Sequence, residues 1–438
     1  MSIKSSWIIL AVSVSSLITT ACTTGGPLEA RHRPTGVHKE IADLISQTPP
    51  PQFSEYLATA ERALGKGRSQ HDGATAKNII AETKAVLPFE GKPAEKCAGS
   101  RHTAGALLIH GLTDSSFVMR NVAQVLQSYP SCLLVRAIVL PGHGTVPGDL
   151  LATRYQEWTK AVEYGINSFE GTVQDLYIIG FSTGGALAVY ETLTREQLKI
   201  QPTALVLLSP AIKVKNRFAF AADWHKLISW AYPRAAWSAI AIDEDFAKYE
   251  SFPKNAGYEV FLLTKAVGKL LQNKKINVPM LIAVSKDDAT IDADAAISFF
   301  RRNTTVGDQS RLILYTKEEQ TQDQDSRIQR RRGLGARRAI RDISHLAIPI
   351  SPTNLHYGED GDYVNCLHYL NKNEKMQTCK NRSLRSVEYG ESSDSNNGVL
   401  RRLTWNPDFE HLRDEIGRFV AMTQYCSLKL VRPEPVEG

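Results

Sequence analysis

The sequence has few cysteines, little net charge and no long hydrophobic run. Its 438 residues include six cysteines, and none stands in a CxxC or Cys/His pattern with the spacing of a zinc site. We therefore expect no structural metal ion. The net charge of +6 is spread over 52 basic and 46 acidic residues. This excess is too mild to indicate nucleic-acid binding, and no nucleic-acid-binding motif or clear internal repeat is present.

An apolar run from Trp7 to Ile18 is too short for a confident membrane-spanning helix, which needs about 20 residues. Lys4 precedes it, and small residues lead from it to Cys22, an order typical of an export signal. The ending resembles a bacterial lipoprotein signal. That resemblance implies that residues 1–22 are the signal and that Cys22 is lipidated. Thr23 then favours the outer membrane of a Gram-negative cell envelope. Ordinary signal cleavage or a retained anchor are the alternatives.

Export would carry the other cysteines into an oxidising compartment, where disulfides form. We expect two pairs, Cys97–Cys132 and Cys366–Cys379, with Cys426 left over.

Residues 23–100 predict a linker and an N-terminal extension packed on the main domain. Three consecutive prolines at 49–51 are followed by helical patterns over Phe53–Leu64 and Ala74–Val86.

From about residue 103, short apolar runs bounded by Gly or Pro alternate with helical periods. This alternation indicates a parallel sheet buried on both faces, so we assign residues 101–438 to one α/β domain. The predicted helices lie near 117–128, 155–169, 184–196 and 292–302. The predicted strands are Ala104–Ile109, Leu133–Val139, Leu176–Ile179, Ala204–Leu208, Pro279–Val284 and Leu312–Tyr315.

Three stretches of this domain break the alternation. Residues 210–275 are rich in aromatic side chains, with Trp224, Trp230 and Trp237 among them, and predict a helical cap over an active site. Some of these rings must pack the cap's own core. Residues 317–341 carry seven arginines. We expect a solvated loop there, with contact to an anionic membrane as the alternative. Residues 351–405 predict an excursion pinned by the second disulfide.

The central motif is Gly180-Phe181-Ser182-Thr183-Gly184, a G-x-S-x-G sequence between a predicted strand and a predicted helix. The glycines allow the tight backbone turn that lifts the serine hydroxyl above the sheet. The motif therefore predicts Ser182 as a nucleophile.

His110-Gly111-Leu112 ends the first predicted strand, and Pro141-Gly142-His143-Gly144 follows the next one. With these motifs the chain resembles the α/β-hydrolase superfamily over residues 103–350, and in particular its carboxylesterase and monoglyceride-lipase-like members. The resemblance implies that the backbone N–H groups of Leu112 and Thr183 form an oxyanion hole, whose preorganised donors stabilise a tetrahedral intermediate. It makes His110 structural and His143 a loop organiser.

The same resemblance places the acid after the strand Pro279–Val284 and the base last in the chain. Asp288 fits the family pattern, and Asp287 is the alternative. His345 stands at the family's place for the base, but 57 residues separate it from Asp288, about twice the usual gap. The runner-up is His356; two further histidines, His368 and His411, also follow the acid.

The fold expected is therefore an α/β hydrolase that needs no cofactor and acts on a small acyl-ester or lipid substrate. We expect a carboxylesterase or a monoacylglycerol-type lipase that forms an acyl-enzyme on Ser182. A serine at this position argues against epoxide hydrolase and dehalogenase chemistry. An acyltransferase or thioesterase using the same residues is the alternative, and a non-catalytic envelope lipoprotein is a third interpretation.

Overall fold

The computed structural model describes residues 24–70, 76–95, 104–128, 131–215, 229–305, 307, 309–318, 323–332, 339–384, 386–391 and 398–431. Cys22, Cys97 and Trp224 lie outside these described residues, as does the predicted signal. Within the described ranges, no helix is long and apolar enough to cross a membrane.

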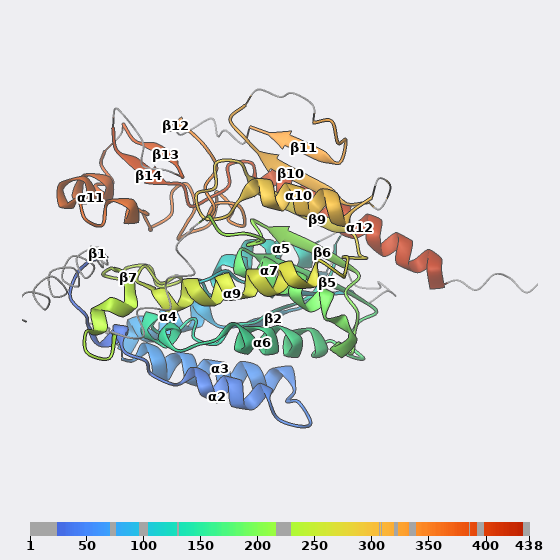
Figure 1. Ribbon diagram of the computed structural model, residues 1–438, viewed down its shortest axis with the longest axis horizontal. Helices are drawn as coiled ribbons and strands as arrows, with labels where there is room; N and C mark the ends of the chain where they lie inside the picture. Colours follow the sequence, from blue (N-terminus) through green and yellow to red (C-terminus); the bar gives the residue numbers. More distant parts are fainter. Residues whose placement is uncertain are drawn as a thin grey trace, which may run out of the picture.

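A mostly parallel eight-stranded sheet forms the centre of the fold (Figure 1). Its strand order is β11-β10-β9-β6-β5-β3-β4-β2, and β2 at one edge runs antiparallel to β4. All six predicted strands belong to this sheet, so the predicted α/β fold class is confirmed. The strands are β2 (Phe89–Gly91), β3 (Ala104–Ile109), β4 (Leu134–Ala137), β5 (Asp175–Phe181), β6 (Ala204–Leu208), β9 (Met280–Ser285), β10 (Arg311–Tyr315) and β11 (Ile328–Arg331).

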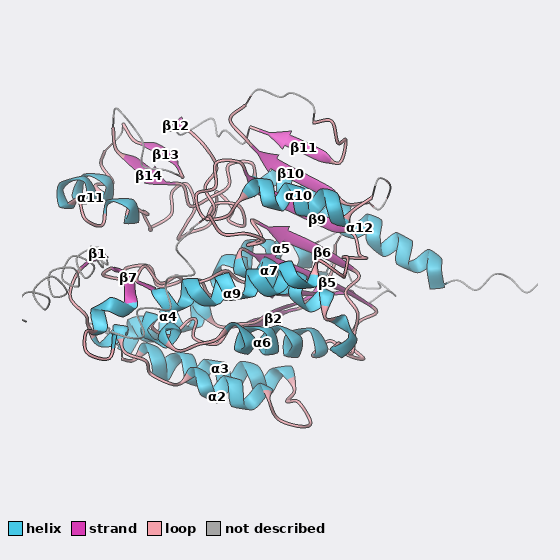
Figure 2. Cartoon of the chain, viewed as in Figure 1, coloured by secondary structure: helices cyan, strands magenta, loops and turns pink. Residues whose placement is uncertain are grey.

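Helices cover both faces of the sheet (Figure 2). The side chains of β3 alternate between two hydrophobic clusters: Leu107 and Ile109 belong to one, and Ala106 and Leu108 to the other. Such burial on both faces explains the continuous apolar runs in the sequence. The first cluster contains residues of α6 (Tyr155–Asn167), α7 (Thr183–Leu193), α9 (Lys254–Leu270) and α10 (Ala293–Asn303), and the second contains residues of α5 (Arg120–Gln127) and α12 (Phe409–Val431).

The N-terminal extension packs on the main domain through three helices, α2 (His38–Ile45), α3 (Phe53–Arg68) and α4 (Ala76–Val86). The fully buried Tyr56 of α3 connects the extension to the sheet. Its hydroxyl accepts a hydrogen bond from the Val139 amide at 2.9 Å, just beyond β4. The extension therefore shares the core of the main domain, because Tyr56 and Leu64 lie in the first hydrophobic cluster.

Two further small sheets and several 3-10 helices complete the described secondary structure. One sheet contains β1 (Thr24–Gly25), β7 (Trp237–Ile240) and β8 (Phe252–Pro253), and the other contains β12 (Ala339–Ile340), β13 (Glu388–Gly390) and β14 (Leu400–Arg402), with α11 (Asn373–Lys380) nearby. The 3-10 helices are η1 (Ala30–His32), η3 (Ser116–Met119), η4 (Pro147–Leu151), η5 (Arg195–Gln197), η7 (Pro233–Ala236) and η8 (Leu367–Tyr369).

The stretch 317–341 differs from the solvated loop that we predicted. Its residues Ile328–Arg331 form β11, the parallel edge strand beside β10. Two of its arginines are held in ion pairs, Arg330 with Glu318 at 3.0 Å and Arg331 with Asp408 at 2.7 Å. A strand with a single apolar residue lacks the alternation that marks a half-buried strand, so the sequence pattern concealed it.

The stretch 210–275 also differs from a purely helical cap. Its main helix, α9, packs against α7 and contributes Val260 and Leu263 to the core. The described residues before α9 form loops and the short strands β7 and β8. The described aromatic side chains here differ in exposure: Trp237 is 1% exposed and packs edge-on against His32, whereas Trp230 is 84% exposed.

The C-terminal excursion 351–405 contains the predicted disulfide between Cys366 and Cys379, whose Cα atoms are 6.1 Å apart. Cys132 is disulfide-bonded as well. Its predicted partner Cys97 lies outside the described residues.

Candidate active site

Ser182 stands at the sharp turn between β5 and α7. Its backbone has φ 53° and ψ −114°, and residues other than glycine rarely adopt a positive φ. Glycines make the turn possible: a Cβ on Gly184 would lie 2.2 Å from the Ile109 carbonyl oxygen, and one on Gly180 would lie 2.4 Å from the Gly184 carbonyl oxygen. The strained backbone holds the serine side chain at the carboxyl end of the sheet, where ligands of open α/β sheets bind.

His345 contacts the Ser182 side chain directly. Its Nε2 atom lies 2.9 Å from the Ser182 Oγ atom, and its Nδ1 atom lies 2.6 Å from Oδ2 of Asp288. A carboxylate only accepts hydrogen bonds, so Nδ1 carries the ring proton and Nε2 is left to accept the serine hydroxyl proton. The structure thus brings the three predicted residues into one chain of hydrogen bonds.

Asp288 is fully buried after β9, and its charge is compensated there. Its Oδ1 atom accepts the amides of Thr290 at 2.7 Å and Ile291 at 2.9 Å. Burial alone would raise the pKa of this carboxyl, but the nearby His345 and these hydrogen bonds outweigh it and lower the pKa. Asp288 is therefore ionised at neutral pH.

The alternative candidates lie elsewhere. Asp287 forms an ion pair with Lys317 at 3.1 Å. The His356 ring binds Asp245 and Asp362, the His368 ring contacts the Leu400 carbonyl, and the His411 ring contacts Gln329. The geometry therefore favours Asp288 and His345 over every alternative that the sequence left open.

The two glycine-containing loops, residues 110–112 and 141–144, are linked to each other by His110. His110 accepts the Leu140 amide at Nε2 (3.0 Å), and its Nδ1 atom lies 2.8 Å from the Gly111 carbonyl. Burial lowers the pKa of His110 to about 4, so the ring is neutral and donates from Nδ1. It ties the first loop to the second. His143 packs face to face with Tyr249, with ring centroids 6.4 Å apart, and burial holds its pKa well below the usual value.

The two predicted oxyanion donors flank Ser182. Thr183 is the first residue of α7, where a backbone N–H has no acceptor within the helix. The loop before Leu112 passes close to Ser182, since a Cβ on Gly111 would lie 3.1 Å from the Ser182 Cβ. The positions of Leu112 and Thr183 therefore suit the role that the resemblance implies.

Two acidic residues and one lysine near the site were not found by sequence reasoning. Glu391, beyond β13, accepts the amides of both Ala289 and His345, at 3.0 and 3.3 Å. Lys248 and Asp245 support the loop that contains Leu112, as described below. No motif marks these positions, because each depends on contacts between segments that are distant in the sequence.

A partly open cavity of about 290 Å³ lies beside the site. Phe181 and Leu346, the neighbours of Ser182 and His345 in the chain, form part of its wall. Its lining is mixed: apolar side chains face it together with Asp114, Asp245, Lys248, Tyr357, Asn365 and Thr404. In the described part of the chain, no cluster of three or more His, Cys, Asp or Glu residues could hold a metal ion.

A protein-family model and one curated protein match parts of this chain. Residues 100–317 match the model of a hydrolase family described as serine aminopeptidase, S33. The thermostable monoacylglycerol lipase of Bacillus sp. (strain H-257) is 34% identical over 88 residues, which are 20% of this chain and 34% of the lipase. The chain thus matches only about a third of the length of that curated relative.

Solved structures with related folds are more distant in sequence. A structure from a study of LipS and LipT, two metagenome-derived lipolytic enzymes, is 20% identical, with a TM-score of 0.42 over 53% of this chain and 88% of its own. The monoacylglycerol lipase of Paleococcus ferrophilus is 19% identical, with a TM-score of 0.38 over 52% and 88%. The family match spans the sheet from β3 to β10, the G-x-S-x-G turn and the loop of Asp288. The chain therefore has the α/β-hydrolase fold and is a serine hydrolase that resembles this family over residues 100–317.

Proposed function

We propose that this chain hydrolyses carboxylic esters, as a carboxylesterase or monoacylglycerol-type lipase, through an acyl-enzyme on Ser182. The observation that carries the proposal is the hydrogen-bonded chain from Ser182 through His345 to the buried Asp288. The 88-residue similarity to a monoacylglycerol lipase supports an ester substrate.

In the proposed reaction, Nε2 of His345 accepts the hydroxyl proton as the Ser182 Oγ atom attacks the ester carbonyl carbon. The carbonyl π electrons move to oxygen, and the Leu112 and Thr183 N–H groups stabilise that negative charge. When the intermediate collapses, the alcohol leaves with the proton from His345. Water then attacks the acyl-enzyme and gives its proton to His345, which returns it to Ser182 as the carboxylic acid leaves. Asp288 stays ionised and stabilises the imidazolium.

Two related functions use the same residues. An acyltransferase or thioesterase would pass the acyl group to another acceptor or accept a thioester. The matched family is described as a serine aminopeptidase, so an aminoacyl amide is the third substrate class to compare.

The test is a direct comparison of substrates on the purified chain. We expect p-nitrophenyl esters to be hydrolysed, and we expect little turnover of acyl-CoA thioesters or aminoacyl p-nitroanilides. Product analysis with added glycerol should give free acid rather than a new ester. Faster turnover of the anilides would replace the proposal with an aminopeptidase, and a dominant transfer product would replace it with an acyltransferase. Ser182→Ala is the control that must be inactive in every arm.

We also propose that the chain is exported and anchored in the cell envelope by lipid on Cys22. The support is the order of charged start, apolar run and small residues before this cysteine.

A further inference from the structure

The loop that contains Leu112 is fastened to a distant segment of the chain. We call residues 111–115 the oxyanion loop and residues 245–251, between β7 and β8, the clamp segment. The hydrogen bonds between them run from the Ser115 hydroxyl to the Ala247 carbonyl (2.8 Å), from the Tyr249 amide to the Thr113 carbonyl (2.8 Å), and from the Lys248 ammonium to the Asp114 carboxylate (2.6 Å) and the Leu112 carbonyl (3.2 Å). The oxyanion loop also contains a strained residue, Thr113 at φ 64°. The conformation of the oxyanion loop therefore depends on the hydrogen bonds from the clamp segment.

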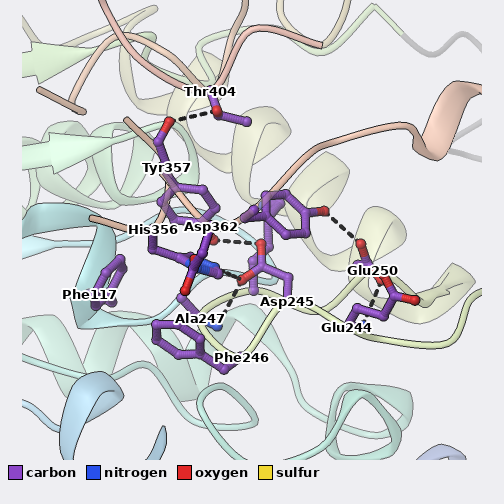
Figure 3. Close-up of polar contacts among 12 residues, drawn as sticks. Phe117, Glu244, Asp245, Phe246, Ala247, Glu250, His356, Tyr357, Asp362 and Thr404 are labelled. Atoms are coloured by element: carbon purple, nitrogen blue, oxygen red, sulfur yellow. Dashed lines mark hydrogen bonds and ion pairs between the residues drawn. The ribbon is translucent and has the colours of Figure 1, made fainter. Parts of the chain in front are cut away.

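Asp245 fixes the clamp segment in turn (Figure 3). Its side chain is fully buried and accepts the Ala247 amide at 2.9 Å. It also accepts His356 Nε2 at 3.0 Å and the Tyr357 hydroxyl at 2.6 Å. A buried carboxylate is costly unless it is hydrogen-bonded and its charge is compensated. His356 and Tyr357 both belong to the C-terminal excursion, beyond the segment matched by the family model.

His356 supplies the compensating charge. Its second nitrogen, Nδ1, contacts the Asp362 carboxylate, and the rings of Phe117 and Phe246 pack against it. Burial alone would lower the pKa of His356, but the hydrogen bonds and charges of the two aspartates outweigh it and raise the pKa. The other titratable groups facing the ring are Tyr357 and Tyr363, whose own pKa values are raised well above the usual one. The imidazolium donates to both aspartates, whereas a neutral ring could donate to only one.

We infer that Asp245, held by His356 and Tyr357, is a positioning residue that sets the Leu112 amide for the oxyanion through the clamp segment. This inference rests on the proposed function. It assigns a role to the excursion 351–405: the chain outside the family-matched segment completes the support of the active site. Complete removal of one oxyanion donor lowers kcat by about 10²–10³-fold. A displaced Leu112 amide should therefore lower kcat by up to this amount.

The experiment measures kcat, KM and the rate of fluorophosphonate labelling of Ser182 across pH. Asp245→Asn and His356→Gln should each lower kcat and the labelling rate by roughly 10- to 100-fold, with KM changed far less. His368→Gln is the matched control. It makes the same chemical change in the same excursion, where His368 contacts the Leu400 carbonyl instead, and it should leave the labelling rate unchanged.

A purely structural role would not reproduce the expected pH dependence. Wild-type labelling should decline on the alkaline side as His356 loses its proton, and His356→Gln should lack this alkaline limb. Asp362→Asn removes one of the two carboxylates, whose side chain is largely exposed, and should move the limb to lower pH without changing the plateau below it. Wild-type labelling rates in folded Asp245→Asn and His356→Gln would overturn the inference, as would an alkaline limb that does not move in Asp362→Asn. No labelling of the wild type would instead reject the proposed function.

Discussion

The Nε2 atom of His345 lies 2.9 Å from the Oγ atom of Ser182, although 163 positions separate the two residues in the chain. Three elements create this contact: the turn after β5 holds the serine, and Glu391 and Asp288 hold the backbone and ring of the histidine. Because a serine hydroxyl is a weak nucleophile until a base takes its proton, the reactivity of Ser182 depends on this distance.

His345→Ala should lower kcat for ester hydrolysis by roughly 10⁴- to 10⁶-fold, because removal of a triad member has effects of this size. His411→Ala is the matched control, since His411 contacts Gln329 away from the site, and it should retain wild-type kcat. Ser182→Ala sets the background rate. Initial rates on a p-nitrophenyl ester and fluorophosphonate labelling are the measurements. Strong labelling in His345→Ala would show that another group activates the serine.

Asp288→Asn should lower kcat by about 10⁴-fold, because an amide can no longer hold the histidine in the tautomer that accepts the serine proton. Asp287→Asn alters the adjacent carboxylate, which pairs with Lys317, and should change kcat less than about threefold. The comparison is sharp because the two variants differ by one position. Equal losses in both variants would contradict the assignment of Asp288.

Acyl-chain preference should favour short esters. Medium chains would be preferred if the aromatic residues of 210–275 lined an apolar pocket. However, the cavity beside Phe181 is lined in part by Asp114, Asp245 and Lys248, and polar groups are unfavourable neighbours for a buried acyl chain. We expect kcat/KM for p-nitrophenyl esters to be highest between acetate and butyrate and to fall towards palmitate. A maximum at eight or more carbons would show instead that an apolar pocket holds the acyl chain.

Glu191 in α7 makes the stability of the protein depend on pH. Burial raises the pKa of Glu191 to about 8, and repulsion from Glu163 adds to the effect. The folded protein therefore binds this proton more tightly than the unfolded chain, whose carboxyl titrates near 4.5. The free energy of unfolding should fall as pH rises from about 4.5 to about 8.

Glu191→Gln removes this titration. The variant should match the wild type near pH 4.5 and exceed it above pH 8 by on the order of 1–4 kcal/mol, measured by urea unfolding. Glu196→Gln is the surface control, because Glu196 is exposed beyond the end of α7. A stability difference that is the same at both pH values would contradict a titrating Glu191.

The sequence sufficed to predict the sheet and the sharp turn at Ser182, because both depend on local patterns. Buried parallel strands appear in the sequence as continuous apolar runs. The turn around Ser182 has no room for a side chain at Gly180 or Gly184, so its glycines mark it in the sequence. The contact of His345 with Asp288 could be predicted despite their long separation in the chain, since chain order within the fold is preserved when a loop lengthens.

The rest could not be predicted because it depends on contacts between distant segments. Strand β11 carries arginines that appear solvated in sequence but pair with Glu318 and Asp408. Glu391 looks like a surface acid, yet its side chain is 1% exposed and pairs with Arg402 at 2.8 Å. Asp245 lies in no sequence motif. Its contacts with His356 and Tyr357 of the excursion are seen only in the folded chain.

Membrane attachment should depend on Cys22 and not on the arginines of 317–341. A lipid anchor stabilises attachment by about 0.8 kcal/mol for each buried CH₂ group, whereas an arginine near an acidic surface contributes about 1 kcal/mol. Arg330 and Arg331 are moreover engaged in ion pairs with Glu318 and Asp408.

In a Gram-negative host, Cys22→Ser should shift the protein to the soluble fraction or leave an unprocessed precursor. Cys426→Ser, the matched control, should leave it in the membrane fraction, as should neutralising Arg330 and Arg331. Mass spectrometry of the mature N-terminus should find a lipidated Cys22, and an unmodified N-terminus at another residue would refute the anchor.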